Sequence, residues 1–167
     1  MKKLLATLLV LSMLLCLPMA LAEEGGEIAS IENTPSYEGT QIALGDTGVV
    51  LTIPSDWTVA QAPDGCLCAY MSADGTIGMS VMLAQDLDTC YEAASKMVEE
   101  GTAKDLMEVS INDNYYMLYT SADELSNYAY LPYSDENCLV IAFGASSADV
   151  QSDIPAEILG TAALAEE

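Results

Sequence analysis

Groups that could carry out acid–base or nucleophilic catalysis are scarce in this sequence. It contains no histidine, and its four basic residues are all lysines, so Ser–His and Cys–His nucleophiles are excluded. Lys96 lies on the outer face of a predicted helix and Lys104 at its end, where we expect both to be solvated and charged. Carboxylate pairs such as Asp86 and Asp88 occur, but none stands in the apolar context that a catalytic acid needs. We therefore expect that the protein is not an enzyme. A hydrolase that uses carboxylates is the alternative.

Cysteine chemistry is the next possibility. Cys66 and Cys68 are two residues apart, whereas Cys90 and Cys138 stand alone. Of the five cysteines, Cys16 lies in the N-terminal apolar run, which we expect to be removed on export. The remaining four are an even number, which in an exported chain is typical of disulfides. A bond between Cys66 and Cys68 is awkward because their side chains leave one strand in parallel, so we expect one of them to bridge to Cys90 or Cys138. Four buried thiols are the alternative, and the spacing lacks the two close pairs of a typical zinc site.

Oxygen-rich turns raise the question of calcium. Asp86–Asp88 and Asn112–Asn114 are such turns, but neither matches the twelve-residue calcium loop with its glycine and terminal glutamate. The second is most simply a hairpin turn, and Asp88 is a helix-entry residue. We therefore expect no cofactor, and a calcium-dependent surface protein remains an alternative.

Aromatic side chains give the candidate binding surface. The chain has a single tryptophan, and several of its nine tyrosines fall on two predicted neighbouring strands. A tyrosine-rich sheet face could bind a protein or a glycan. Cross-strand aromatic packing under a helix is the simpler interpretation of the tyrosines, and the tryptophan could equally pack over the core. The candidate residues are Trp57, Tyr115, Tyr119, Tyr128 and Tyr130.

The charge of the chain excludes several partner classes. Its 26 acidic residues give a formal net charge of −22. A nucleic-acid surface requires a basic patch, and nothing here could build one. The same argument disfavours anionic lipid surfaces. So acidic a surface is consistent with solubility outside the cell.

The N-terminus has the pattern of an export signal. Lys2 and Lys3 precede an apolar run that is too short to span a membrane, and residues 1–22 end in an Ala-x-Ala cleavage pattern. We expect cleavage after Ala22 and no stable membrane insertion, with lipidation at Cys16 as the competing interpretation. The acidic, non-periodic residues 23–38 predict a flexible leader.

The remaining chain, residues 39–167, predicts one α+β domain. Residues 49–53 alternate between the two faces of a strand, and Pro54 ends that strand because it has no N–H group to donate. Thr89 and Glu92 form a capping-box pattern at the start of a helix that we expect to end near Lys104. Further strands are predicted at 40–44, 66–72, 76–84, 107–111, 115–121, 126–132 and 137–145, and a second helix at 153–163. We expect an antiparallel sheet of about six to seven strands with helices packed on its faces.

This order of elements resembles the PsbP-like superfamily. The resemblance rests on TIPSDW at 52–57, LVIAFGA at 139–145 and ILG at 158–160. It implies an α/β/α sandwich that is non-catalytic and docks to other proteins. The chain lacks the basic surface of the photosystem members, and an export signal excludes a nuclear partner, so the resemblance transfers no functional residues. We therefore expect an unknown protein partner at the cell envelope or in the medium.

Overall fold

The computed structural model describes residues 28–165, and within that range the chain forms eleven strands and two helices. The strands are β1 (Ala29–Ile31), β2 (Gly39–Ala43), β3 (Val49–Pro54), β4 (Thr58–Val59), β5 (Cys66–Met71), β6 (Ile77–Ala84), β7 (Ala103–Ile111), β8 (Asn114–Ser121), β9 (Ser126–Ser134), β10 (Asn137–Ala145) and β11 (Ala163–Leu164). The helices are α2 (Leu87–Glu99) and α3 (Ile154–Leu159). The export signal predicted for residues 1–22 lies outside the described residues. None of the described helices combines the length and apolarity needed to cross a bilayer.

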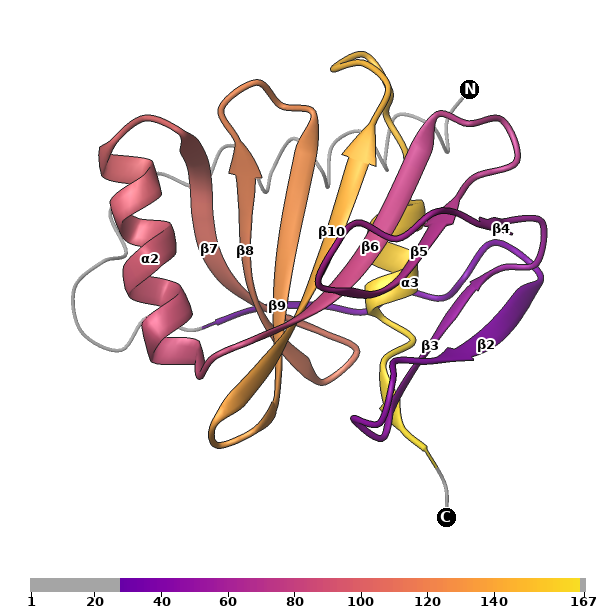
Figure 1. Ribbon diagram of the computed structural model, residues 1–167, viewed down its shortest axis with the longest axis horizontal. Coiled ribbons are helices and arrows are strands. Elements are labelled where there is room, and N and C mark those ends of the chain that lie inside the picture. The colour runs from indigo at the N-terminus through magenta and orange to yellow at the C-terminus, as the bar shows by residue number, and fades with distance from the viewer. Residues whose placement is uncertain (1–27, 166–167) are drawn as a thin grey trace.

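Eight of the strands form one large sheet in the order β1-β7-β8-β9-β10-β6-β5-β4 (Figure 1). Hairpins make most neighbours antiparallel, but β1 runs parallel to β7, with Ala29 opposite Val109. The other three strands form a second sheet in the order β11-β3-β2. The structure thus shows a mainly β chain with few helices, where an α+β domain was expected. It corrects the single antiparallel sheet of six to seven strands to a mixed sheet of eight and a separate sheet of three.

β3 is the centre of the small sheet and carries much of the core. Val49, Leu51 and Ile53 are buried, as their alternation predicts, and Val50 on the opposite face is buried as well. β2 pairs with β3 from Gly39 opposite Pro54 to Ala43 opposite Val50. The strand ends at the proline, where the ladder lacks a donor. The short β11 covers the other edge of β3.

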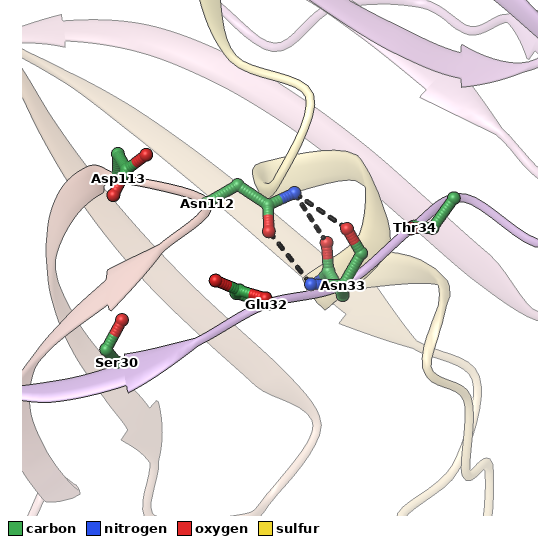
Figure 2. A pocket seen from close by; sticks show the side chains of 6 residues that line it. All are labelled: Ser30, Glu32, Asn33, Thr34, Asn112 and Asp113. Carbon is green, nitrogen blue, oxygen red and sulfur yellow. Dashed lines mark hydrogen bonds between the residues drawn. The ribbon is translucent and has the colours of Figure 1, made fainter.

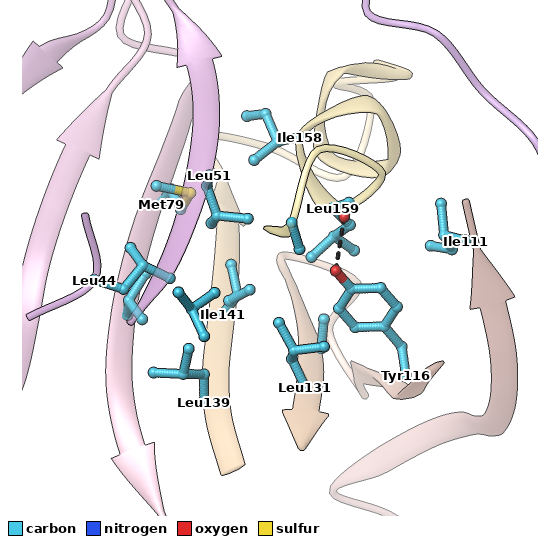
Figure 3. Close-up of a cluster of buried hydrophobic side chains, with 14 of the residues drawn as sticks. Leu44, Leu51, Met79, Ile111, Tyr116, Leu131, Leu139, Ile141, Ile158 and Leu159 are labelled. Atoms are coloured by element: carbon cyan, nitrogen blue, oxygen red, sulfur yellow. Dashed lines mark hydrogen bonds between the residues drawn. The ribbon is translucent and has the colours of Figure 1, made fainter. Parts of the chain in front are cut away.

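The main core lies between one face of the large sheet and the layer formed by β3 and α3 (Figure 3). Its least exposed side chains come from the large sheet, from β3 and from α3, and include Leu51, Met79, Leu139, Ile141 and Ile158. Tyr116 of β8 also lies in this core with 0% exposure, and its hydroxyl donates a 2.7 Å hydrogen bond to the backbone oxygen of Leu159. One tyrosine thereby ties the large sheet to the end of α3.

A second, smaller core lies between the opposite face of the large sheet and α2. Cys90 and Ala94 of the helix are buried there with Met117 and Tyr119 of β8. The face of the large sheet that bears the main core is covered by β3 as well as by the short α3. The predicted helices on the sheet faces are therefore found only in part: α2 covers one face, and the other face is covered mainly by β3 together with α3.

The start of α2 differs from the predicted capping box. Asp86, and not Thr89, is the N-cap residue, and its carboxylate accepts hydrogen bonds from the backbone N–H and the hydroxyl of Thr89 at 2.9 Å each. Aspartate is as good a cap as threonine, and the helix begins one turn earlier than predicted. It ends at Glu99, and Gly101 with φ of 72° turns the chain into β7.

The N-terminal leader predicted for residues 23–38 is incorporated into the fold from residue 28 onward. β1 pairs with β7, and the backbone N–H of Asn112 donates to the oxygen of Ile31 at 2.9 Å. Residues 23–27 lie outside the described part. Residues Ala29–Ile31 thus form a strand that the sequence pattern does not predict, because a three-residue strand has no periodicity to reveal it.

The second helix is shorter than the predicted 153–163. α3 ends at Leu159, with Pro155 in its first turn as expected. Asp153 is its N-cap residue, but its side chain makes no capping hydrogen bond. Ala163 and Leu164 continue as β11 and pair with β3.

Candidate functional site

A groove of about 670 Å³ beside Trp57 is the main candidate site. Four separate parts of the chain line it: the segment before β2, the turn after β3, the β5–β6 turn and the segment before α3. It therefore lies at the β5–β6 end of the large sheet, whereas α2 packs on β7 and β9 toward the other end (Figure 1). Only tertiary folding brings these parts together.

The turn that ends β3 positions the tryptophan. The backbone N–H of Trp57 donates to the oxygen of Pro54 at 3.0 Å, and the N–H of Ser55 donates to the oxygen of Glu38 at 2.9 Å. The ring of Trp57 is partly buried and packs against the main core while it also lines the groove. The two interpretations of Trp57, core residue and binding residue, are thus both compatible with its position.

Tyr37 is the second aromatic wall of the groove. Its hydroxyl donates to the backbone oxygen of Thr52 at 2.8 Å, which fixes the ring against β3. Burial, with a smaller contribution from the nearby carboxylate of Glu157, raises the pKa of Tyr37 to about 12. The phenol is therefore neutral at physiological pH, and it presents a rigid apolar side to the groove.

The β5–β6 turn contributes an ordered carboxylate. Oδ1 of Asp74 accepts hydrogen bonds from the hydroxyl of Ser72 (2.7 Å), the backbone N–H of Thr76 (3.0 Å) and the hydroxyl of Thr76 (2.7 Å). These bonds lower the pKa of Asp74 to about 2, so the group is ionised across the physiological range. All three donors contact Oδ1, which leaves Oδ2 without a donor among the described residues.

Two further carboxylates, those of Asp56 and Asp149, line the same groove and are exposed. The two lysines of the described part lie elsewhere, Lys96 beside Glu100 on α2 and Lys104 at the start of β7 beside Glu124. No cation of residues 28–165 therefore lines the groove, which combines aromatic walls with net negative charge.

The tyrosines of the predicted binding surface pack under α2. Tyr119 is 5% exposed, and its ring stacks on that of Tyr128 with centroids 4.7 Å apart; the Tyr130 ring lies at 5.9 Å. Burial and a hydroxyl hydrogen bond to Tyr119 hold the pKa of Tyr130 far above its usual value. Tyr115 is partly buried on the same strand as Tyr119, and burial together with Glu108 raises its pKa to about 12. The structure therefore favours packing over an open tyrosine face, and separates these residues from Trp57.

The four cysteines of the described residues, Cys66, Cys68, Cys90 and Cys138, are free thiols, so the structure forms no disulfide among them. Cys66 and Cys68 lie on β5 at a bulge, partly accessible. Cys90 and Cys138 are buried, and both are anchored at Gln85: the Cys90 thiol donates to its carbonyl oxygen at 3.6 Å and the Cys138 backbone N–H at 3.1 Å. Burial raises the pKa of Cys68 and Cys90 and raises that of Cys138 to about 11.

The accessibility of these thiols predicts two classes of reactivity. With a chromogenic disulfide reagent at pH 8, we expect Cys66 and Cys68 to react at least about tenfold faster than Cys90 and Cys138, because burial shields the latter pair from the reagent. Single Cys→Ser variants assign each phase, and a denatured, non-reduced sample gives the total. Equal rates at all four sites would contradict the burial, and a shortfall of thiols in the denatured sample would restore the disulfide prediction.

A second, polar pocket of about 430 Å³ lies where β1 meets the β7–β8 turn. Figure 2 shows that its central side chains, Asn33 and Asn112, face one another. The Asn112 amide donates to the backbone oxygens of Asn33 at 2.8 Å and Gly160 at 3.0 Å, and its oxygen accepts from the backbone N–H of Asn33 at 2.8 Å. The Asn33 amide donates to the oxygen of Ala156 at 2.7 Å. These amides join three parts of the chain, so we interpret this pocket as structural.

The oxygen-rich turns considered for calcium have local roles. Asn112 and Asp113, with φ of 47° and 67°, form the β7–β8 turn, and the Asn114 amide donates to the oxygen of Ala162 at 3.0 Å. Asp86 caps α2. Among residues 28–165, no three His, Cys, Asp or Glu side chains are grouped so that they could hold a metal ion. The calcium alternative stays a prediction.

Comparison with known proteins gives structural likeness alone. No protein-family model and no curated protein matches the chain. A crystal structure from Bacteroides thetaiotaomicron VPI-5482 is similar with a TM-score of 0.53 and 13% identity over 77% of this chain and 49% of that one. The chain thus spans about half the length of that structure, and the likeness shows a shared fold. The solution structure of cyanobacterial PsbP (CyanoP) from Synechocystis sp. PCC 6803 is similar with a TM-score of 0.48 and 10% identity over 88% of this chain and 99% of that one. A PsbP structure is thus among the solved structures that this chain resembles.

Proposed function

We propose that this chain is an exported, non-catalytic binding module that engages a protein partner at the cell envelope or in the medium. The proposal rests on the groove beside Trp57. An ordered turn holds the single tryptophan of the chain there with its ring partly accessible. Aromatic residues in concave, partly desolvated positions contribute much of the energy at protein interfaces.

The surroundings of the groove fit binding better than catalysis. Asp56 and Asp149 are exposed, and the pKa of Asp74 is lowered, whereas a general acid requires a carboxyl whose pKa is raised. The chain offers no histidine as a base. The export signal predicted for residues 1–22 supports a partner outside the cytoplasm.

Partner capture in the source organism tests this proposal. The full chain, tagged at its C-terminus, is lightly cross-linked and purified, and co-purifying proteins are identified by mass spectrometry. We expect one partner in near-stoichiometric amount, retained by Tyr91→Ala and lost by Trp57→Ala. Tyr91 is a suitable control because it is an aromatic residue on α2, 43% exposed and remote from the groove.

A second variant protects the test against loss of folding. Ala73 lies in the exposed β5–β6 turn and lines the groove, so Ala73→Tyr narrows the groove without removing a core contact. Thermal melting checks that each variant is folded. Absence of any partner with the wild-type chain would overturn the proposed function, and retention by folded Trp57→Ala and Ala73→Tyr would overturn its assignment to the groove.

A further inference from the structure

We propose that the groove beside Trp57 binds a cationic peptide segment, with a lysine or arginine side chain seated between the aromatic rings and the aspartates. This inference rests on the proposed function and adds the chemistry of the partner. It is carried by the coincidence, in one concave site, of two aromatic walls and three carboxylates from three separate parts of the chain.

The aromatic walls suit an organic cation. The face of a tryptophan or tyrosine ring attracts an ammonium or guanidinium group, and the attraction is stronger where water is partly excluded. Trp57 and Tyr37 are both partly buried against the core, and the Tyr37 hydroxyl is committed to Thr52. Their rings are therefore held in place before a ligand arrives, which reduces the entropy lost on binding.

The carboxylates supply complementary charge. Asp74 is oriented through Oδ1 by three donors, so its free Oδ2 can accept a hydrogen bond from an incoming cation. Asp56 and Asp149 flank it from the turn after β3 and from the segment before α3. Because no lysine of the described part lines the groove, an incoming cationic side chain meets carboxylates there and no like charge.

The long aliphatic stem of lysine or arginine also fits the apolar lining. Pro54, Ile77, Val150 and Ile154 line the groove together with the aromatic rings. Such side chains bury their methylene groups on apolar surface and keep the charged head in a polar position. A small inorganic cation would use the carboxylates and leave this surface uncovered, so the lining favours a peptide side chain.

The single tryptophan makes the test direct, because the intrinsic tryptophan fluorescence of the protein comes from Trp57 alone. The purified full chain is titrated with pentalysine at low salt and at 150 mM salt, with pentaglutamate and chitotetraose as alternative probes. We expect a saturable change in Trp57 emission with pentalysine, weaker at the higher salt, and no change with the other two.

Matched charge variants separate the groove from the overall acidity. Asp56→Asn/Asp149→Asn and Glu92→Gln/Asp135→Asn each remove two negative charges, but the second pair lies on α2 and in the β9–β10 turn, away from the groove. We expect the first to weaken pentalysine binding by about three- to tenfold, since exposed charge pairs contribute modest energies. We expect the second to change it by less than about twofold.

Several outcomes would overturn the inference. Equal weakening by the two double variants would assign binding to net charge. A saturable response to chitotetraose, with none to pentalysine, would make the groove a glycan site. If partner capture depends on Trp57 but pentalysine does not bind, the proposed function stands and the cationic ligand is wrong. If partner capture does not depend on Trp57, the assignment of the binding function to the groove is wrong, and the cationic ligand proposed for that groove is wrong as well.

Discussion

Replacing Tyr116 with alanine lowers the free energy of unfolding by about 3–5 kcal/mol, as expected for truncation of a large buried aromatic residue. The ring is 0% exposed within the main core, and its hydroxyl is the donor to Leu159 at 2.7 Å. Loss of the ring leaves a cavity between the large sheet and α3 and deprives a backbone oxygen of its partner. Urea denaturation followed by circular dichroism measures the effect.

Two control variants divide this loss into its parts. Tyr116→Phe keeps the ring and removes the hydroxyl, so we expect a cost of about 1–3 kcal/mol from the unpaired Leu159 oxygen. Tyr91→Ala, on the exposed face of α2, should change stability by less than about 0.5 kcal/mol. A Tyr116→Ala variant as stable as Tyr91→Ala would show that α3 does not close over this face of the sheet.

Replacing Asn112 with alanine should lower the free energy of unfolding by about 2–4 kcal/mol. The change removes the amide that connects Asn33 and Gly160, and leaves their partly buried backbone groups without partners. It also forces a residue with a Cβ atom but no polar side chain to hold a φ of 47°. The same denaturation experiment applies.

Glycine variants separate the hydrogen bonds from the backbone conformation. Asn112→Gly tolerates positive φ, so its cost reports the lost hydrogen bonds. Asp113→Gly, at the neighbouring position with φ of 67° and an exposed side chain, should be close to neutral. If Asn112→Gly were also neutral, the side-chain hydrogen bonds of Asn112 would contribute nothing to stability.

The sequence predicts those elements whose signals are local. The alternation in β3, the Asp-Gly turn between β5 and β6, and the Asn-Asp turn between β7 and β8 are each encoded within a few residues. The three strands that were missed, β1, β4 and β11, have two or three residues each. They exist because a neighbouring strand offers unpaired backbone groups, and no pattern within so short a segment records that.

The candidate site was predictable only in part. Trp57 stood out as the single tryptophan, but its companions Tyr37, Asp74 and Asp149 come from distant segments that only tertiary packing brings to one groove. The start of α2 illustrates a different difficulty. Both Asp86 and Thr89 are good cap residues. The choice between them depends on the residue at which β6 ends, which is set by strand pairing in the sheet.

The amide contacts of Asn33 have a consequence for the order of folding. Asn33 lies 79 residues before Asn112 and 123 residues before Ala156, yet it bonds to both. Contacts across such separations carry a large loop-closure entropy and are typical of slow-folding topologies. A chain emerging from the ribosome cannot complete the hydrogen bonds of Asn33 until Ala156 has been added. The contacts that tie the segment after β1 to α3 are therefore among the last that the chain can form.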